Sequence, residues 1–236
     1  WRTDFTILFY GYLRFKPMGI LNMKRLLLLT ALIMPAFVSA EPASNMVWMP
    51  ETLDFVKNGN TKNGEQLAQS CISCHGEKGI SAIGMFPSLA GQTANYTYKQ
   101  LRDYADDKRV NPLMSSIAKG LSEQDSADLA AWFASLPAAQ NKASKQNLSK
   151  AEVLVDKGNG KKILPPCFTC HEASGKGQRM DTPALAGQQA EYTINTLLEY
   201  KNGTRHNDIY SRMRLIAKQL SAEEIKQLGE YYQQLK

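Results

Sequence analysis

Two copies of the pattern C-x-x-C-H constrain this chain more than any other feature of its sequence. The first copy is Cys71–His75 and the second is Cys167–His171. Together they contain all four cysteines and two of the three histidines. The pattern is typical of c-type haem attachment, in which two thiols bind the porphyrin covalently and the adjacent histidine binds the iron. The sequence therefore predicts two covalently bound haem c groups, attached through Cys71, Cys74, Cys167 and Cys170, with His75 and His171 as iron ligands.

Two other uses of paired cysteines compete with haem attachment. A zinc site built from two C-x-x-C pairs normally has its pairs roughly 15–20 residues apart, whereas Cys71 and Cys167 are 96 residues apart. A disulfide framework in an exported protein does not require a histidine after each cysteine pair. We therefore favour haem attachment.

The similarity between the two parts of the chain extends beyond the cysteine motifs, as it does in duplicated domains. At a separation of 96 residues, the matched positions are Pro87 and Pro183, Leu89–Gln92 and Leu185–Gln188, Tyr96 and Tyr192, Leu101 and Leu197, Tyr104 and Tyr200, and Arg109 and Arg205. Farther along, the separation becomes 99 residues, and the matched positions are Met114 and Met213, Ala118–Lys119 and Ala217–Lys218, and Leu121–Ser122 and Leu220–Ser221. The sequence therefore predicts an internal duplication whose second copy has a short insertion before Met213.

The N-terminal segment has the features of a secretory signal peptide. Met23 opens a basic segment, residues 26–38 are apolar, and Ala40 ends a run of small residues that suits cleavage. The apolar run is shorter than the about 20 residues of a membrane span, although an uncleaved anchor is the alternative. We expect a non-native extension at 1–22, a signal peptide at 23–40 that is cleaved after Ala40, and a periplasmic protein, which agrees with haem attachment outside the cytoplasm.

The charge of the chain is unevenly distributed. The full chain has a formal net charge of +6, but residues 41–236 have a net charge of only +2. Residues 41–140 carry a net charge of −3, and residues 141–236 carry +5. This pattern gives no indication of nucleic-acid binding. The asymmetry is consistent with electrostatic steering toward a charged partner, and equally with an ordinary solvated surface.

Helical patterns recur in both copies, and no stretch alternates as a strand would. We expect helices at 94–105 and 190–201, and capping boxes at Ser122 and Ser221 that open the last helix of each copy. The stripes of apolar and aromatic residues in those last helices are interpreted as core: Leu129, Trp132, Phe133 and Leu136 in the first, and Leu228, Tyr231, Tyr232 and Leu235 in the second. The expected domains are residues 41–137 and 150–236, joined by a linker at 138–149.

The helix that precedes each C-x-x-C-H motif is expected to pack against the last helix of its copy. Gly64 and Gly160 would permit a close approach of the two helices. Pro165–Pro166, just before Cys167, should distort this helix in the second copy, because proline removes a backbone donor and clashes with the preceding turn.

The second axial ligand of each iron must come from elsewhere in its copy. Methionine and histidine are the usual choices. Met114 and Met213 are matched by the repeat and lie 39 and 42 residues after the motif histidines, so we predict that they bind the irons, with an ordinary core role as the alternative. Met85, Met180 and His206 have no matching residue in the other copy. His206 is expected in a loop, with ligation of the second iron as the alternative.

Two further matched pairs suggest contacts around each haem. Pro87 and Pro183 each follow the motif histidine by 12 residues, and a carbonyl group there would accept a hydrogen bond from the histidine Nδ1–H. Arg109 and Arg205 are candidates for contacts with haem propionates, and a solvated surface position is the alternative.

The duplicated motifs, the L-A-G-Q segments, the matched methionines and the paired C-terminal helices resemble the dihaem cytochrome c4 family over residues 41–236. The resemblance implies an all-α fold of two tandem class I cytochrome c domains with their haem propionates near the interface. It also implies His/Met coordination at both irons. The implied function is periplasmic electron transfer from a cytochrome bc complex to a terminal haem–copper oxidase, without enzymatic activity of its own and with possible peripheral association with the membrane.

Two other functions remain open. One is the dihaem cytochrome subunit of a flavocytochrome or another periplasmic dehydrogenase, which would have a permanent catalytic partner. The other is a dihaem peroxidase, which needs an iron with an open or displaceable site for peroxide. The matched methionines in both copies argue against the peroxidase.

Overall fold

The computed structural model describes residues 42–140, 146–178 and 180–236, and the expected extension and signal peptide lie outside these ranges. The first half, residues 42–140, contains α2 (Pro50–Lys57), α3 (Thr61–Leu67), η1 (Ala68–Cys71), α4 (Ile72–His75), α5 (Ala94–Ala105), α6 (Pro112–Lys119) and α7 (Glu123–Ser135). The second half, from residue 146 onward, contains α8 (Ser149–Lys157), η2 (Gly160–Lys162), α9 (Phe168–His171), α10 (Ala190–Asn202), η3 (Ile209–Ser211), α11 (Arg212–Gln219) and α12 (Ala222–Gln234).

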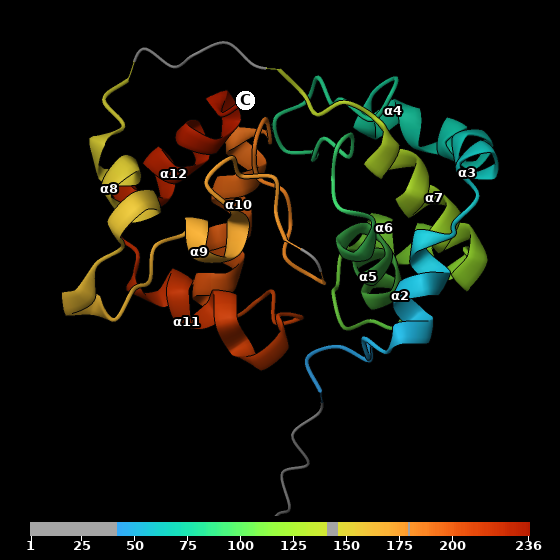
Figure 1. The fold of residues 1–236 in the computed structure, drawn as a ribbon, viewed down its shortest axis with the longest axis horizontal. Helices are drawn as coiled ribbons and strands as arrows, with labels where there is room; N and C mark the ends of the chain where they lie inside the picture. The colour runs from blue at the N-terminus through green and yellow to red at the C-terminus, as the bar shows by residue number, and fades with distance from the viewer. Residues whose placement is uncertain (1–41, 141–145, 179) are drawn as a thin grey trace, which may run out of the picture. The chain divides into compact units, whose positions relative to one another are not determined.

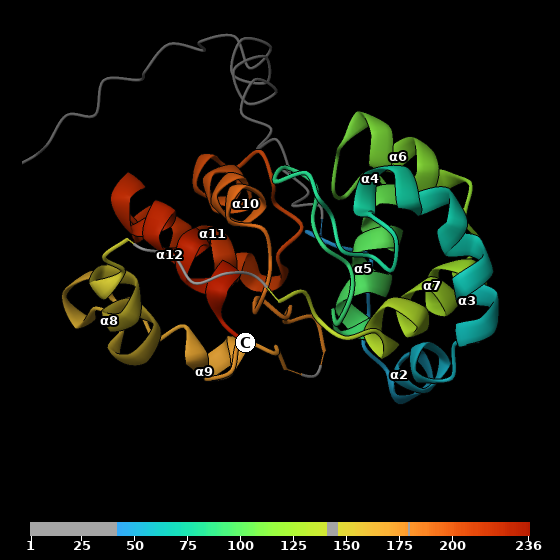
Figure 2. The same ribbon diagram turned by 90° about the horizontal axis from the view of Figure 1, so that it is seen from above.

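The all-α fold class predicted from the sequence is confirmed. Within the described ranges the chain forms no strand, and its one strand-like feature is an isolated bridge between Asn159 and Leu164. Residues 42–236 form one compact unit, and Figures 1 and 2 both show α2–α7 grouped together and α8–α12 forming a second group. No helix in the part of the chain that the structure describes has the length and apolar character needed to cross a bilayer.

The last helix of each half organises the core around it, as the apolar stripes predict. In the first half α7 packs against α3 and α5, and in the second half α12 packs against α10 and α8. Phe133 and its counterpart in the second core, Tyr232, are 4% and 3% exposed. Both helices begin with the expected capping box, in which Ser122 and Ser221 accept a hydrogen bond from the backbone N–H three residues later.

Gly64 permits the close packing of α3 on α7 that the sequence suggests. A Cβ atom at this position would lie 2.1 Å from the backbone oxygen of Asp128, so no larger residue fits without moving the helices apart. The corresponding prediction for Gly160 is wrong, because this residue lies in η2 and a Cβ atom there would have no neighbour within 4 Å.

The two glycines therefore provide a matched pair of substitutions. We expect Gly64→Ala to lower the free energy of unfolding by about 1–3 kcal/mol through overpacking. Gly160→Ala should be neutral or raise it by up to about 1 kcal/mol, because alanine reduces the entropy of the unfolded chain. Denaturant unfolding of both variants measures the difference, and equal effects would contradict the close contact of α3 with α7.

Pro165–Pro166 distorts the second copy of the helix before the cysteine motif, as predicted. In the first half α3, η1 and α4 follow one another without interruption from Thr61 to His75. In the second half the helical turn ends at η2, and Ile163 adopts a left-handed backbone conformation with φ of 53°. The halves are thus most different just before the motif and just before Met213.

The ends of the expected linker take part in the packing of the molecule. Ala139 and Leu148 are 4% and 5% exposed, and α8 already begins at Ser149. The backbone of Ala139 lies very close to Gly187, whose φ is 71°. A Cβ atom at position 187 would lie 2.1 Å from the Ala139 oxygen. This close approach explains why a glycine follows Leu-Ala in the second L-A-G-Q segment.

Candidate functional site

Each C-x-x-C-H motif ends in a short helix, α4 or α9, that brings its cysteines and histidine to the same part of the half. None of the four cysteines is paired in a disulfide. Burial raises the pKa of the Cys71 thiol, and it raises the pKa of Cys167 to about 11. Cys167 packs against the core of the second half and Cys71 against the core of the first. Each motif therefore places its first cysteine beside the apolar core of its half.

The two motif histidines are buried and held in the same way. His75 and His171 are 7% and 8% exposed, and their Nδ1–H groups donate to the carbonyl oxygens of Pro87 and Pro183 at 2.9 and 3.0 Å. This confirms the contact predicted from the spacing. Burial lowers the pKa of both rings, so each is a neutral imidazole whose Nε2 lone pair is available to a metal.

The matched methionines occupy equivalent places at the start of two helices. Met114 lies in the first turn of α6 and Met213 in the first turn of α11. Both are partly buried, and Met213 packs against the core of the second half. Met85 and Met180 are 54% and 38% exposed, and His206 is an exposed residue in the loop that follows α10.

The alternative of a solvated surface position for the matched arginines is wrong. Arg109 is 8% exposed, and its guanidinium group stacks 4.7 Å from the ring centroid of Tyr104 in its own half. Its Nη2 donates to the hydroxyl of Tyr192 in the second half at 3.1 Å, and its Nη1 donates to Gln100 Oε1 at 3.0 Å.

Arg205 repeats this arrangement from the other half. It is 3% exposed and stacks 4.6 Å from the ring centroid of Tyr200. Its Nη2 donates to the hydroxyl of Tyr96 in the first half at 2.9 Å and to Gln100 Oε1 at 2.8 Å. Each arginine therefore stacks on a tyrosine of its own half and donates a hydrogen bond to a tyrosine hydroxyl of the other half.

The arginine pair fits an anionic group that is bound between the halves. Neither Arg109 nor Arg205 forms an ion pair with a carboxylate among the described residues. Arg205 Nη1 is buried without a hydrogen-bond partner. Because a buried charge is normally paired and hydrogen-bonded, the residues present here fit an anion. The carboxylates of haem propionates have this chemistry.

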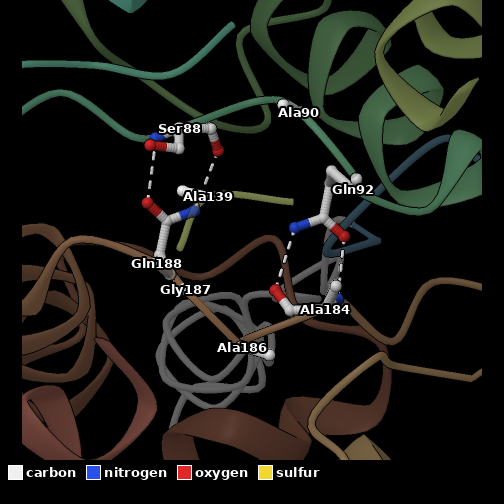
Figure 3. A pocket seen from close by; sticks show the side chains of 9 residues that line it. Ser88, Ala90, Gln92, Ala139, Ala184, Ala186, Gly187 and Gln188 are labelled. Carbon is white, nitrogen blue, oxygen red and sulfur yellow. Dashed lines mark hydrogen bonds between the residues drawn. The ribbon is translucent and has the colours of Figure 1, made fainter. Parts of the chain in front are cut away.

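Two glutamines of the L-A-G-Q segments join the halves through reciprocal hydrogen bonds (Figure 3). Gln188 accepts from Ser88 N–H at 2.9 Å and donates to Ser88 O at 3.0 Å. Gln92 accepts from Ala184 N–H at 2.8 Å and donates to Ala184 O at 3.0 Å. The pocket between them has a volume of only about 10 Å³, so the interface is closely packed.

Sequence reasoning identified these glutamines as repeated residues but did not assign them a role. The same holds for the matched Tyr96 and Tyr192, and Lys99, Gln100 and Asn207 were missed. A polar residue repeated outside the cysteine motif was the available signal. Such repetition indicates that the residue has a role in both copies, but it does not indicate that this role is a contact between the two copies.

The interface predicts a large loss of stability for one conservative substitution. Gln188→Met keeps the size of the side chain but leaves the buried N–H and C=O of Ser88 without partners. Each unsatisfied group costs about 1–3 kcal/mol, so we expect thermal or denaturant unfolding to show a loss of at least about 2 kcal/mol in total. Gln69→Met is the control, because the Gln69 side chain is exposed and bonds only within α3 and η1. Equal stability of the two variants would contradict the interface.

Comparisons with known proteins agree with this geometry. The Cytochrome c family profile matches the chain twice, at residues 61–137 and 158–236. The chain is 38% identical to cytochrome c4 of Thiocapsa roseopersicina over 75% of this chain and 93% of that protein. The crystal structure of reduced recombinant cytochrome c4 from Pseudomonas stutzeri matches with a TM-score of 0.73 at 33% identity, over 75% of this chain and 100% of that chain.

The chain belongs to the dihaem cytochrome c4 family. Its two cytochrome c domains each carry one haem c, and members of the family transfer electrons. A third relative, a "thiosulfate dehydrogenase electron acceptor" from Stutzerimonas stutzeri, is 36% identical over 70% of this chain and 78% of that protein. The haem reading of the cysteine motifs is thus confirmed. Within the described ranges, no three His, Cys, Asp or Glu side chains converge as a zinc site would require.

Proposed function

We propose that this protein is a periplasmic carrier that passes single electrons from a cytochrome bc complex to a haem–copper oxidase. The observation that carries the proposal is the equivalence of the two motif histidines, which are equally buried and each held by a proline carbonyl. Matched ligand sets in both halves suit reversible electron transfer at both irons. A peroxidase would require one site that is open or displaceable.

The proposed ligands are His75 and Met114 in the first half and His171 and Met213 in the second. Cys71 and Cys74 would attach the first haem, and Cys167 and Cys170 the second. Each bound haem supplies an iron that alternates between the ferrous and ferric states. The residues of the chain fix the imidazole rings, keep them neutral and surround the site with apolar side chains, which together set the potential.

Arg109 and Arg205 are proposed to bind haem propionates at the interface between the halves. Both guanidinium groups are buried without carboxylate partners, and Arg205 Nη1 has no hydrogen-bond partner in the described structure. A bidentate contact from arginine to a carboxylate would compensate these charges. Such contacts would place the anionic edges of both haems at the interface.

A redox titration of the purified protein with visible spectra tests the proposed function. We expect two one-electron steps, a c-type haem spectrum in both, and a methionine-to-iron charge-transfer band for each ferric haem. Reduced protein should also lose its electrons rapidly to a haem–copper oxidase. Turnover of peroxide, or a spectrum of a haem without an axial methionine, would contradict the proposal.

A second candidate is the role of electron acceptor for a periplasmic dehydrogenase. It is favoured by the 36% identity with a protein that is named as the electron acceptor of a thiosulfate dehydrogenase. Mixing the oxidised protein with such a dehydrogenase and its substrate distinguishes the candidates. Fast reduction together with stable co-purification would favour this reading, whereas reduction by a cytochrome bc complex alone would favour the respiratory carrier.

Export to the periplasm by the signal peptide at 23–40 is part of the proposal. Haem attachment outside the cytoplasm requires export, and the first match of the Cytochrome c family profile begins at residue 61, after this segment. Mass spectrometry of protein from the periplasmic fraction should show a chain that begins at Glu41 and carries two haems. Retention of residues 23–40 would indicate an uncleaved anchor instead.

A further inference from the structure

The helices that carry the matched methionines are capped in different ways. In the first half, Asn111 Oδ1 accepts hydrogen bonds from the backbone N–H groups of Leu113 and Met114 at 3.1 and 3.0 Å. This side chain satisfies donors in the first turn of α6 that would otherwise lack partners. The backbone of Met114 is therefore held directly by a residue of its own half.

Asn207 occupies the position of Asn111 in the repeat, but it does not cap α11. The insertion Asp208–Tyr210 separates it from the helix, and Asp208 takes over the capping role. Asp208 Oδ2 accepts from the backbone N–H of Arg214 at 2.9 Å, and Oδ1 accepts from Arg214 Nε at 2.6 Å. The side chain of Asn207 is thus free for another contact.

Asn207 instead forms hydrogen bonds with residues of the first half. It is 1% exposed. Its Nδ2 donates to Asp103 Oδ2 at 2.7 Å and to Gln100 Oε1 at 3.0 Å. Its backbone oxygen accepts from Lys99 Nζ at 2.7 Å. Three residues of α5 in the first half therefore fix one residue in the loop that leads to Met213.

Lys99 and Asp103 form a buried ion pair that is suited to this task. Their Nζ and Oδ2 atoms are 2.5 Å apart, and both side chains are 2% exposed. The other carboxylate oxygen of Asp103 accepts from Ser44 Oγ at 2.5 Å. All these partners restrict the rotamers of the pair, so the anchor for Asn207 is rigid.

The Lys99–Asp103 ion pair has no counterpart on α10 in the second half. Asn195 and Glu199 occupy the positions of Lys99 and Asp103 on α10, and both are exposed. The second half therefore provides no equivalent ion pair to hold the loop before Met114. The anchoring follows from the insertion and from the residue types on α5, rather than from the symmetry of the repeat.

The loop between Asn207 and Met213 has a strained backbone. Tyr210 and Ser211 are consecutive residues with φ of 58° and 57°, in the left-handed region that non-glycine residues rarely adopt. Such a conformation persists only where the surroundings determine it. The surroundings here are the anchor at Asn207 on one side and the Asp208–Arg214 contact on the other.

We propose that Lys99 and Asp103 of the first half are positioning residues for Met213, because they fix Asn207 and thereby the loop that presents this methionine to the second haem. The inference rests on the proposed function, in which Met213 is an axial ligand. The proposal assigns to an ion pair of the first half a role at the second haem site, and the positions equivalent to this pair in the second half, Asn195 and Glu199, are exposed. The backbone of Met114 is instead held by the cap that Asn111 provides within its own half.

The test uses the holoprotein with the double substitution Lys99→Met and Asp103→Leu. Removing both charges together avoids leaving a lone buried charge, which would destabilise the fold. In a Met114→Ala background the remaining charge-transfer band reports Met213, and in a Met213→Ala background it reports Met114. Titration of the ferric protein with imidazole then measures how easily each methionine is displaced.

In the Met114→Ala background, we expect the double substitution to tighten imidazole binding at the second haem by about tenfold, which corresponds to about 1.4 kcal/mol of lost positioning. The remaining band should also fade at a lower temperature. In the Met213→Ala background, neither measurement should change. Val56→Ala is the control, because it removes buried atoms from the core of the first half without touching Asn207, and it should leave imidazole binding at the second haem unaltered.

Four outcomes would overturn the inference. If imidazole binding at the second haem is unchanged while Met213→Ala still removes one band, the positioning role fails and the proposed ligands stand. An equal effect at both haems, or an equal effect of Val56→Ala, would indicate general destabilisation. Survival of every band in Met213→Ala would refute both the ligand assignment and the positioning role.

Discussion

Met213→Ala is expected to abolish the methionine-to-iron charge-transfer band of one haem and to lower the potential of that haem. A thioether ligand stabilises the ferrous iron and raises the potential. Its loss should shift the midpoint on the order of 0.1 V or more, within the roughly 0.8 V over which axial ligands set haem potentials. Met114→Ala should have the same effect on the other haem. A redox titration with visible and near-infrared spectra measures both.

Two controls separate ligation from packing. Met213 packs against the core of the second half, so alanine also creates a cavity. Met213→Leu conserves the volume and should cost less than about 1.5 kcal/mol of stability, yet it should remove the band as completely as alanine does. Met85→Ala, at an exposed position, should leave both bands in place. An unaltered spectrum for Met213→Leu would exclude Met213 as a ligand.

Asp103→Ala is expected to be the most destabilising of the substitutions outside the haem motifs. It leaves the ammonium group of Lys99 buried without its carboxylate partner, and breaking a buried pair in this way typically costs about 3–5 kcal/mol. It also removes one acceptor from Asn207 Nδ2 and one from Ser44 Oγ. Denaturant unfolding of the holoprotein, followed by circular dichroism, measures the loss.

The double substitution Lys99→Met and Asp103→Leu provides the matched comparison. Replacing both members of a buried ion pair by apolar residues of similar size is often neutral or stabilising. We therefore expect the double variant to be more stable than Asp103→Ala alone. If Asp103→Ala unfolds at the same denaturant concentration as the parent, then Lys99 and Asp103 do not form a buried pair in solution.

The helices and their caps were predictable because they depend on residues that are close in sequence. The expected helix at 94–105 coincides with α5, and the one at 190–201 ends one residue before α10 does. Both capping boxes are present. The histidine contacts with Pro87 and Pro183 were also predictable, since the spacing is short and occurs twice.

The roles of the matched arginines were not predictable in the same way. Their repetition indicated a shared function, but a stacked arginine at an interface and a surface arginine give the same sequence signal. For Gly160, the repeat suggested a shared role that the structure does not show. It is matched by the repeat to Gly64, but the nearby proline pair ends the helix in the second half and removes its packing partner.

The sequence by itself determined the cofactors, the duplication, the all-α fold and the family, because each of these follows from short motifs or from their recurrence. Only the tertiary structure decided how the halves are joined: by Gln92 and Gln188, by the two arginines, and by Asn207 held on α5. These contacts link residues about 100 positions apart. A hydrogen bond depends on distance in space, and no local pattern shows which distant residues the fold brings together.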